Sequence, residues 1–283
     1  MILKNKELTN NLITRPILLD AGFKPTKKPK PIVIFAHGFK GFKDWGHFND
    51  VMDFFISNEC VFVKFNFSHN GGTAEQPIDF PDLEAFGKNT ITKELNDVSH
   101  ILDWIHTTEE LPKEELDIND ITLIGHSRGG GIAMLAASMD NRIKKIITWA
   151  AISDFERRLP PDLSEWKAKG VVYIENARTK QQMPMYYSFV EDLFANKNTY
   201  NIENAIKKAN QPHLIIHGDN DLTVHIEEAK ELNEWNENAD LKIITGANHT
   251  FDISHPHKAE QLSEAAKKVL TYSLAFINKK IFI

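Results

Sequence analysis

One segment near the middle of the chain reads Ile121-Thr122-Leu123-Ile124-Gly125-His126-Ser127-Arg128-Gly129-Gly130. Its first four residues predict a short buried strand, and the apolar residues 132–139 predict a helix. A Gly-x-Ser-x-Gly pattern between a strand and a helix is typical of a nucleophile elbow, a turn so tight that small residues must flank the serine. Because a helix follows Ser127, free amides and the helix dipole would face an anion formed beside its hydroxyl. The segment therefore predicts Ser127 as a nucleophile.

Short apolar runs on both sides of this segment alternate with helical patterns. The expected strands are 32–36, 61–65, 121–124, 146–149, 213–216 and 241–244, and the expected helices are 48–57, 91–106, 132–139, 226–235 and 259–276. In the second helix, Leu95, Val98 and Ile101 share one apolar face. The alternation predicts an α/β fold in which helices cover both faces of a mostly parallel central sheet. Residues 8–19 are expected to add one or two antiparallel edge strands.

The alternation stops between residues 152 and 208. This stretch begins with a polar, proline-marked part, continues through a short strand pattern at 171–174, and ends in an aromatic, apolar run around 183–193. We interpret it as a small lid inserted within a single domain that spans residues 1–283. Loops at the carboxyl ends of parallel strands build ligand sites in such folds. The lid is therefore expected to contribute to a ligand site.

Several side chains of the lid have two interpretations. The candidate pocket residues are Tyr173, Met185, Tyr186 and Phe189, with Met183 and Tyr187 nearby. They could line an adaptable apolar pocket, or they could form a satellite core that holds the lid on the body. Arg178, in a polar turn, could bind a substrate carboxylate through two hydrogen bonds or serve as a surface or packing residue. The sequence leaves both questions open.

A serine hydroxyl is a poor nucleophile until a base removes its proton, so the chain must also supply a histidine. His249 is the predicted base, because it directly follows the last predicted strand. The acid that orients it is expected after the preceding strand, where Asp221 and Asp219 compete. Asp221 is the predicted acid, whereas Asp219 is expected to cap the turn through its own backbone amides. His213 and His217, on one face of a predicted strand, are expected to be core residues with their hydrogen bonds satisfied; metal binding is the alternative interpretation, and no metal site is predicted.

The oxyanion of a tetrahedral intermediate needs two amide donors aimed at one point. Arg128, the residue after the nucleophile, supplies one. The second is expected from the loop that follows the 32–36 strand and reads His37-Gly38-Phe39-Lys40-Gly41-Phe42. Phe39 is the predicted donor, because Gly38 lets the backbone turn its amide inward. A plain glycine turn is the alternative interpretation of this loop.

These motifs together resemble the α/β-hydrolase superfamily, whose members carry their triad in the order Ser, Asp, His. Within it, the pattern resembles the compact bacterial cinnamoyl/feruloyl-type esterases and the dienelactone-hydrolase-like serine hydrolases. The resemblance spans about residues 15–275 and implies an α/β-hydrolase fold. Dienelactone hydrolases proper use a cysteine nucleophile, whereas this chain has Ser127. The esterases often carry glutamine where this chain has Arg128.

The composition excludes several classes of protein. The chain has 283 residues, 42% of them hydrophobic, which is enough to bury a core and excludes a mainly disordered chain. Its net charge of −6 is opposite to what a nucleic-acid-binding surface needs. Its single cysteine, Cys60, excludes an internal disulfide. No apolar run matches a signal peptide in residues 1–20 or has the length of a membrane span.

From these features we expect a cytoplasmic protein that binds a small-molecule ester, without a cofactor, nucleic-acid or membrane partner. It is expected to be a monomer or a homodimer, and residues 279–283 could form an edge strand or a dimer contact. The predicted reaction is hydrolysis of a small carboxylic ester through a Ser-His-Asp triad and an acyl-enzyme. The alternatives are an aminopeptidase or amidase, a thioesterase, and a non-catalytic ligand-binding protein on the same fold.

Overall fold

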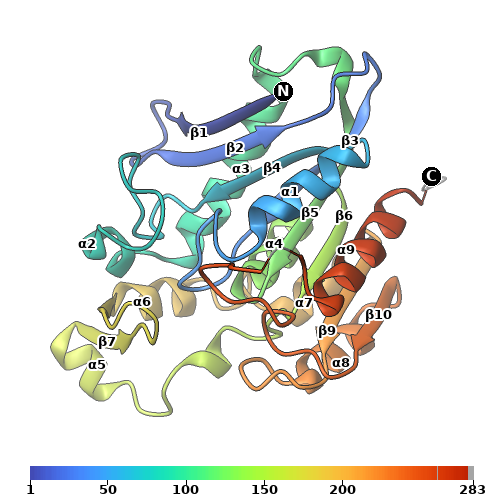
Figure 1. Cartoon of the computed structure of the whole chain (residues 1–283). Helices are drawn as coiled ribbons and strands as arrows, with labels where there is room; N and C mark the ends of the chain where they lie inside the picture. Colours follow the sequence, from blue (N-terminus) through green and yellow to red (C-terminus); the bar gives the residue numbers. More distant parts are fainter. Residues whose placement is uncertain (260, 280–283) are drawn as a thin grey trace.

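The computed structural model describes residues 1–259 and 261–279. An eight-stranded sheet forms the centre of the molecule, with the strand order β1-β2-β4-β3-β5-β6-β9-β10 (Figure 1). The strands are β1 (Ile2–Leu8), β2 (Ile17–Gly22), β3 (Lys30–Ala36), β4 (Val61–Asn66), β5 (Leu116–His126), β6 (Ile143–Trp149), β9 (His213–Gly218) and β10 (Ala239–Ile244). Strand β2 runs antiparallel to β1 and β4, and the remaining pairs are parallel. The expected mostly parallel α/β sheet is confirmed.

Two antiparallel strands, β1 and β2, end the sheet on this side and lie before and after the middle of the segment in which they were expected. Strands β1 and β2 flank residues 9–16, which form the turn between them. The carboxamide oxygen of Asn10 accepts the backbone N–H groups of Leu12 and Ile13 at 2.7 and 3.0 Å. These side-chain bonds compete with ladder pairing and hold the backbone in a turn. The expected antiparallel strands are present and overlap both ends of residues 8–19, but each extends beyond that range.

Helices cover both faces of the sheet. They are α1 (Phe48–Ser57), α2 (Leu83–Gly87), α3 (Ile91–Thr107), α4 (Arg128–Met139), α5 (Ser164–Lys169), α6 (Ser188–Ala195), α7 (Ile202–Lys208), α8 (Ile226–Trp235) and α9 (Glu264–Ile277). Side chains of α1 and α9 form one buried cluster with one face of the sheet, and those of α3, α4, α7 and α8 form another with the opposite face.

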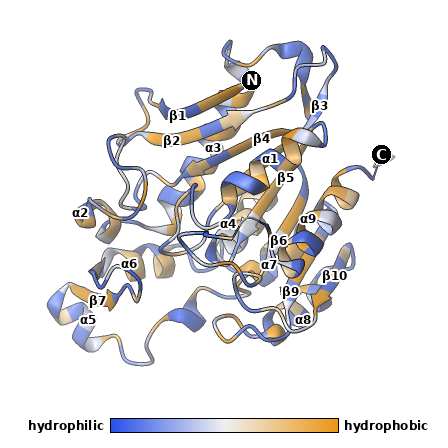
Figure 2. Ribbon diagram, viewed as in Figure 1, coloured by the Kyte–Doolittle hydropathy of each residue, from blue (hydrophilic) through white to orange (hydrophobic). Residues whose placement is uncertain are grey.

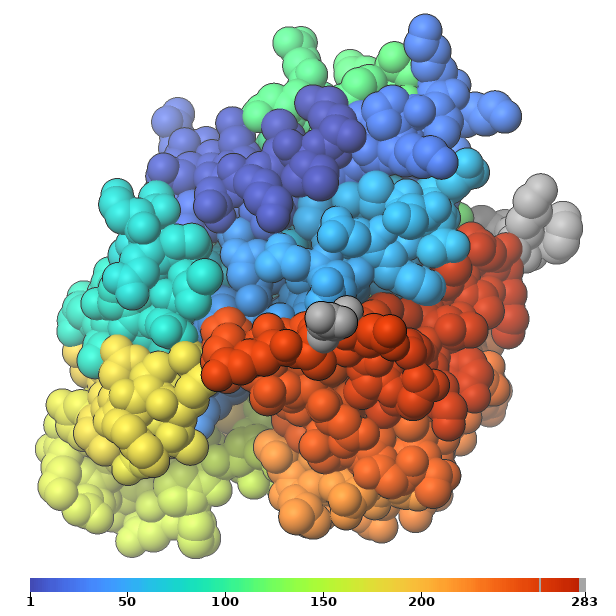
Figure 3. Space-filling view, in the orientation of Figure 1, coloured from blue at the N-terminus to red at the C-terminus, as the bar shows by residue number. Residues whose placement is uncertain are grey.

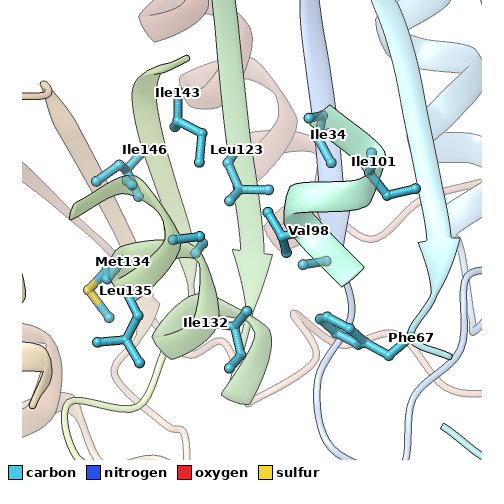
Figure 4. Packing of buried hydrophobic residues seen from close by; sticks show 14 of the residues in the cluster. Ile34, Phe67, Val98, Ile101, Leu123, Ile132, Met134, Leu135, Ile143 and Ile146 are labelled. Carbon is cyan, nitrogen blue, oxygen red and sulfur yellow. The ribbon is translucent and has the colours of Figure 1, made fainter. Parts of the chain in front are cut away.

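Alternation along β3 shows how the strands serve both clusters. Ile32 and Ile34 belong to the cluster with α3 and α4, whereas Val33 and Phe35 belong to the cluster with α1 and α9. Figure 4 shows the cluster with α3 and α4, where Ile34 and Val98 are among the buried apolar side chains. Hydrophobic residues accordingly concentrate along the central strands (Figure 2). A continuous apolar strand such as β3 therefore marks a position covered on both faces.

Two helices begin away from their predicted starts. Helix α4 begins at Arg128 rather than at residue 132, because the glycines after the elbow already adopt helical geometry. Helix α9 begins at Glu264 rather than at residue 259. The hydroxyl of Ser263 accepts the backbone N–H of Ala266 at 2.9 Å and supplies an N-cap there. Apolar periodicity located both helices but not their first turns.

The segment between β6 and β9 contains its own two-stranded antiparallel sheet, β7 (Val171–Glu175) with β8 (Gln182–Tyr186). With α5 and α6 it lies apart from the central sheet in Figure 1. The carboxylate of Asp192 on α6 accepts the backbone N–H of Thr92 on α3 at 3.0 Å, which ties this segment to the body. Helix α7 belongs to the buried cluster with α3 and α4, as do Phe189, Val190 and Leu193 of α6.

Within the described ranges, no helix is both long and apolar enough to cross a membrane. Residues 280–283 lie outside these ranges, as does most of the tail considered as an edge strand or dimer contact.

Candidate active site

Ser127 occupies a strained turn between β5 and α4. Its backbone has φ 54° and ψ −120°, in a region that non-glycine residues rarely adopt and that costs about 1–3 kcal/mol. A Cβ atom added at Gly125 would lie 2.2 Å from the carbonyl oxygen of Gly129, and one at Gly129 would lie 2.4 Å from that of Ala36. The helix can therefore approach the turn and the end of the neighbouring strand β3 only because both positions lack side chains.

The two predicted oxyanion donors, Phe39 and Arg128, lie on segments next to Ser127. Arg128 is the first residue of α4, and Phe39 lies in the loop after β3, whose last residue pairs with Gly125. A Cβ added at Gly38 would come within 3.0 Å of the Cβ of Ser127, so this loop lies against the serine. Within the described part of the chain, neither the Phe39 nor the Arg128 amide donates a hydrogen bond. Both amides are thus available to an external acceptor.

The loop that carries Phe39 is held by buried polar contacts farther along. The backbone N–H of Lys43 donates to the side-chain oxygen of Asn66 at 2.6 Å. The Lys43 ammonium lies 2.9 Å from the carboxylate of Asp20, and both side chains are buried. These contacts fix the loop to β2 and β4, so the position of the Phe39 amide follows from the sheet.

His249 and Asp221 are joined directly. The imidazole Nδ1 of His249 lies 2.7 Å from Oδ2 of Asp221, whose side chain is fully buried. The other carboxylate oxygen, Oδ1, accepts the backbone N–H groups of Thr223 and Val224 at 2.8 and 2.9 Å. Burial alone would raise the pKa of Asp221, but hydrogen bonds from His217, His249 and Val224 hold it well below its usual value. Asp221 is therefore ionised at neutral pH.

Asp219, the competing carboxylate, lies on the same loop in a different role. Its Oδ1 accepts the backbone N–H of Gly246 at 2.6 Å, and the residue is exposed. The expectation that Asp219 caps its own turn was wrong, because its side chain bridges to the loop after β10. The structure brings Asp221, and not Asp219, to His249.

Two other buried histidines, His126 and His213, have lowered pKa values. Burial lowers the pKa of His126 to about 3, and its Nε2 donates to the backbone carbonyl of His249 at 3.0 Å. His213 is also buried, with its pKa lowered to about 3, and its Nε2 lies 2.9 Å from the Thr148 hydroxyl. The Nε2 of His217 donates to the Val224 carbonyl at 2.8 Å. His213 and His217 thus each have a protein partner at Nε2, whereas the buried Nδ1 of each has none among the described residues, so the expected satisfaction is met only in part.

Two cavities meet at Ser127. One, of about 410 Å³, contains His249 and is lined also by Phe39, Trp45, Ser127, Asn176 and Arg178; we call it the histidine cavity. The other, of about 420 Å³ and mainly apolar, is lined by Phe39, Ser127, Arg128, Phe155, Trp166, Tyr173, Met185 and Phe189; we call it the lid cavity. Figure 3 shows the surface hollowed between the yellow inserted segment and the orange C-terminal part. Ser127 and Phe39 line both cavities.

The predicted pocket residues divide among several environments. Tyr173, Met185 and Phe189 line the lid cavity. Arg178 lines the histidine cavity, where its guanidinium pairs with Asp79. Tyr186 lines neither cavity: side chains alternate along β8, so it points away from the Met185 side, and its hydroxyl donates to Glu84.

The satellite core that was the alternative interpretation also exists. Buried Met183 packs with Phe42, Phe80 and Phe86. The pocket and the satellite core therefore coexist, and Met185 of β8 contributes to both.

Sequence reasoning missed several contributors to the site. Glu94 on α3 pairs with Arg128, since its Oε2 accepts the Arg128 Nε–H at 3.0 Å. An acidic residue four positions before Val98, on the apolar face of α3, was the available signal. Phe155 and Trp166 line the lid cavity from a stretch that the sequence marked only as polar. Within the described residues, no group of three or more His, Cys, Asp or Glu side chains is arranged to hold a metal ion.

Comparison with known proteins places the chain among esterases. The sequence profile of the BD-FAE family matches residues 23–236. A Mycoplasma pneumoniae protein named "Putative esterase/lipase 2" is 26% identical, over 81% of this chain and 85% of its own length. Its Mycoplasma genitalium namesake is 30% identical over 40% of this chain, and this match covers 34% of that protein.

Solved structures agree on the fold. Est1E from Butyrivibrio proteoclasticus, determined with ferulic acid bound, superposes with a TM-score of 0.69. It is 21% identical, and the match covers 94% of this chain and 97% of that one. Together with the sheet order, this likeness confirms the α/β-hydrolase fold that the resemblance implied.

Proposed function

The chain belongs to the BD-FAE family of esterases, and from this we propose that it hydrolyses small carboxylic esters through Ser127, His249 and Asp221. The observation that carries the proposal is the 2.7 Å contact between His249 and Asp221 at the cavity that Ser127 lines. The strained elbow adds support, because it exposes the serine hydroxyl at a helix N-terminus. Within the described residues Ser127 and His249 are not hydrogen-bonded, and such contacts often form only when substrate binds.

In the first half of the reaction, the Ser127 oxygen attacks the ester carbonyl carbon while His249 Nε2 accepts the hydroxyl proton. Asp221 holds the imidazole through Nδ1 and stabilises the imidazolium that forms. The Phe39 and Arg128 amides donate to the tetrahedral oxyanion. The intermediate collapses, His249 returns its proton to the departing alkoxide, and an acyl-enzyme is left on Ser127.

In the second half, water attacks the acyl carbon and transfers a proton to His249. The second tetrahedral intermediate then breaks at the Ser127 oxygen. His249 returns the proton to that oxygen, the carboxylic acid leaves, and the enzyme is restored. No cofactor is required, because each bond is broken with a proton that His249 carries.

In this proposal each of the two cavities holds one part of the ester. His249 must stand beside the leaving oxygen to protonate it, so the alcohol part occupies the histidine cavity. The acyl part then occupies the lid cavity, whose lining is mainly apolar. Among the described residues, no Asp or Glu lines either cavity, so a substrate amine would find no counter-charge there. This favours an ester over the substrate of an aminopeptidase.

The test is intact-mass analysis after treatment with a fluorophosphonate, followed by peptide mapping. One adduct on Ser127 is expected, and it should be absent from Ser127→Ala and strongly reduced in His249→Ala. Hydrolysis of p-nitrophenyl esters should disappear in the same variants. An adduct elsewhere, or wild-type turnover by Ser127→Ala, would overturn the proposal. A folded, unlabelled wild-type protein that binds esters without cleaving them would favour the ligand-binding alternative.

A further inference from the structure

The side chain of Arg128 is a buried charge in an apolar cavity. Its side chain is 10% exposed and lines the lid cavity next to Ser127. The guanidinium carbon lies 4.7 Å from the centre of the Phe189 ring and 5.7 Å from that of Phe39. These two rings hold the planar group between the oxyanion loop and the lid. The proposed oxyanion role uses the Arg128 amide and leaves this side chain without a function.

The hydrogen bonds of the guanidinium are incomplete. Arginine commonly binds a carboxylate through two parallel N–H groups, which satisfies both ends of the fork. Here Glu94 accepts only the Nε–H. The Nη2 atom is buried and has no hydrogen-bond partner among the described residues. A buried donor without an acceptor is costly, so the arrangement is suited to an acceptor that arrives with the ligand.

The charge of the site indicates what kind of acceptor fits. Glu94 is buried, pairs with Arg128 and also accepts the Asn89 amide at 2.7 Å. At the other end of the cavity, Arg158 pairs with buried Glu228. Each cation is already balanced by a carboxylate outside the cavity lining. A carboxylate on the substrate would bury an additional charge without a partner, whereas a hydroxyl or keto oxygen would add none.

We infer that Arg128 selects esters whose acyl part carries a neutral oxygen close to the reacting carbonyl, such as a hydroxyl or keto group. This inference rests on the proposed function. Arg128 directly follows Ser127, so its side chain reaches only the first few atoms of an acyl chain attached to that serine. The remainder of the acyl chain packs against the apolar wall that includes Phe155, Trp166 and Met185.

The test compares p-nitrophenyl esters in isosteric pairs, with the leaving group constant. Lactate is compared with isobutyrate, and β-hydroxybutyrate with isovalerate, because a hydroxyl replaces a methyl in each pair. In the wild-type protein, at least one hydroxylated ester should have a kcat/KM roughly tenfold to hundredfold above its partner, corrected for spontaneous hydrolysis. Arg128→Met should bring that ratio close to one. Arg128→Gln, which keeps an N–H donor, should retain part of the preference.

The ratio of the two kcat/KM values distinguishes a loss of specificity from a loss of folded structure, because a general loss of order would lower kcat/KM for both esters of a pair. Arg128→Met leaves Glu94 buried without its partner, so the double variant Glu94→Gln/Arg128→Met serves if the single variant fails to fold. Equal kcat/KM within both wild-type pairs, or a preference that survives in Arg128→Met or in the double variant, would overturn the inference while the esterase proposal stands. Absence of turnover and of Ser127 labelling in the wild-type protein would overturn both.

Discussion

The Asp221 carboxylate allows the charge of the proposed triad acid to be removed with almost no change in its shape. In Asp221→Asn, the carboxamide oxygen is expected to take the place of Oδ1, because the Thr223 and Val224 amides donate to that atom. The NH₂ group must then occupy the place of Oδ2, facing Nδ1 of His249. Two N–H groups cannot face each other, so the imidazole is forced to carry its proton on Nε2.

That tautomer cannot serve as the base. With the proton on Nε2, the imidazole has no lone pair directed toward Ser127. The equivalent change in a Ser-His-Asp protease lowers kcat by about 10,000-fold, which corresponds to about 5 kcal/mol of transition-state stabilisation. We expect a loss of similar size here, because the carboxylate is buried and two backbone amides fix its orientation.

The assay is kcat/KM for p-nitrophenyl acetate together with the rate of fluorophosphonate labelling. Asp219→Asn is the matched control, since it makes the same chemical change two residues away. Its carboxamide oxygen can still accept the Gly246 N–H that Asp219 accepts at 2.6 Å, so activity should stay within about twofold. The assignment of the acid would be refuted if Asp221→Asn retained more than about a tenth of the wild-type kcat/KM. It would also be refuted if Asp219→Asn lost as much activity as Asp221→Asn.

Four further substitutions test the backbone around this site and one buried carboxyl group. Ser127→Gly should abolish turnover yet raise the free energy of unfolding by about 1 kcal/mol, measured by urea denaturation, because glycine relieves the strain at φ 54°. Gly125→Ala should destabilise the protein by about 3 kcal/mol or more through its 2.2 Å contact with Gly129, whereas Gly246→Ala, with open space around it and φ +78°, should cost about 1–2 kcal/mol. Burial raises the pKa of Asp97 to about 8, so the unfolded chain ionises first and this group makes stability fall as pH rises from 3.8 toward 8. The stability of Asp97→Asn relative to the wild-type protein should therefore rise between about pH 5 and about pH 8, by at most about 1.4 kcal/mol per pH unit. Thermal melts of both proteins across this range measure the difference. A stability difference that does not change with pH would contradict the raised pKa of Asp97.

The parts of the site that could be predicted are those whose signal is local. Gly125 is required by its contact with Gly129 within the elbow itself, so the sequence there records the geometry directly, whereas Gly129 is required by its contact with Ala36 at the end of the neighbouring strand β3. His249 and Asp221 follow the ends of β10 and β9, and neighbouring parallel strands bring those ends together. The pairing of strands thus turned separate short motifs into one predicted cluster.

The parts that could not be predicted depend on contacts between distant segments. Arg128 and Glu94 are 34 residues apart, and nothing near either residue specifies the other. Tyr186 and Met185 are adjacent and both have large, mainly apolar side chains, yet the pleat of β8 directs them to opposite sides of the strand. Period-two alternation separates such residues into two sets, but it does not say which set faces the cavity. That choice depends on where the inserted segment docks.

Two different parts of the chain build the two halves of the site. The carboxyl ends of the central strands carry the proposed serine, acid, base and oxyanion amides, and strand ends and buried contacts fix their positions. The inserted segment supplies most of the lid cavity and is held through contacts such as that between Asp192 and Thr92. Substitutions in the inserted segment can therefore change the acyl preference while the catalytic geometry persists. Arg128 belongs to both parts, because its amide faces the proposed oxyanion and its guanidinium lies under Phe189 of the inserted segment. A change of its side chain should consequently alter substrate choice without moving the backbone on which the chemistry depends.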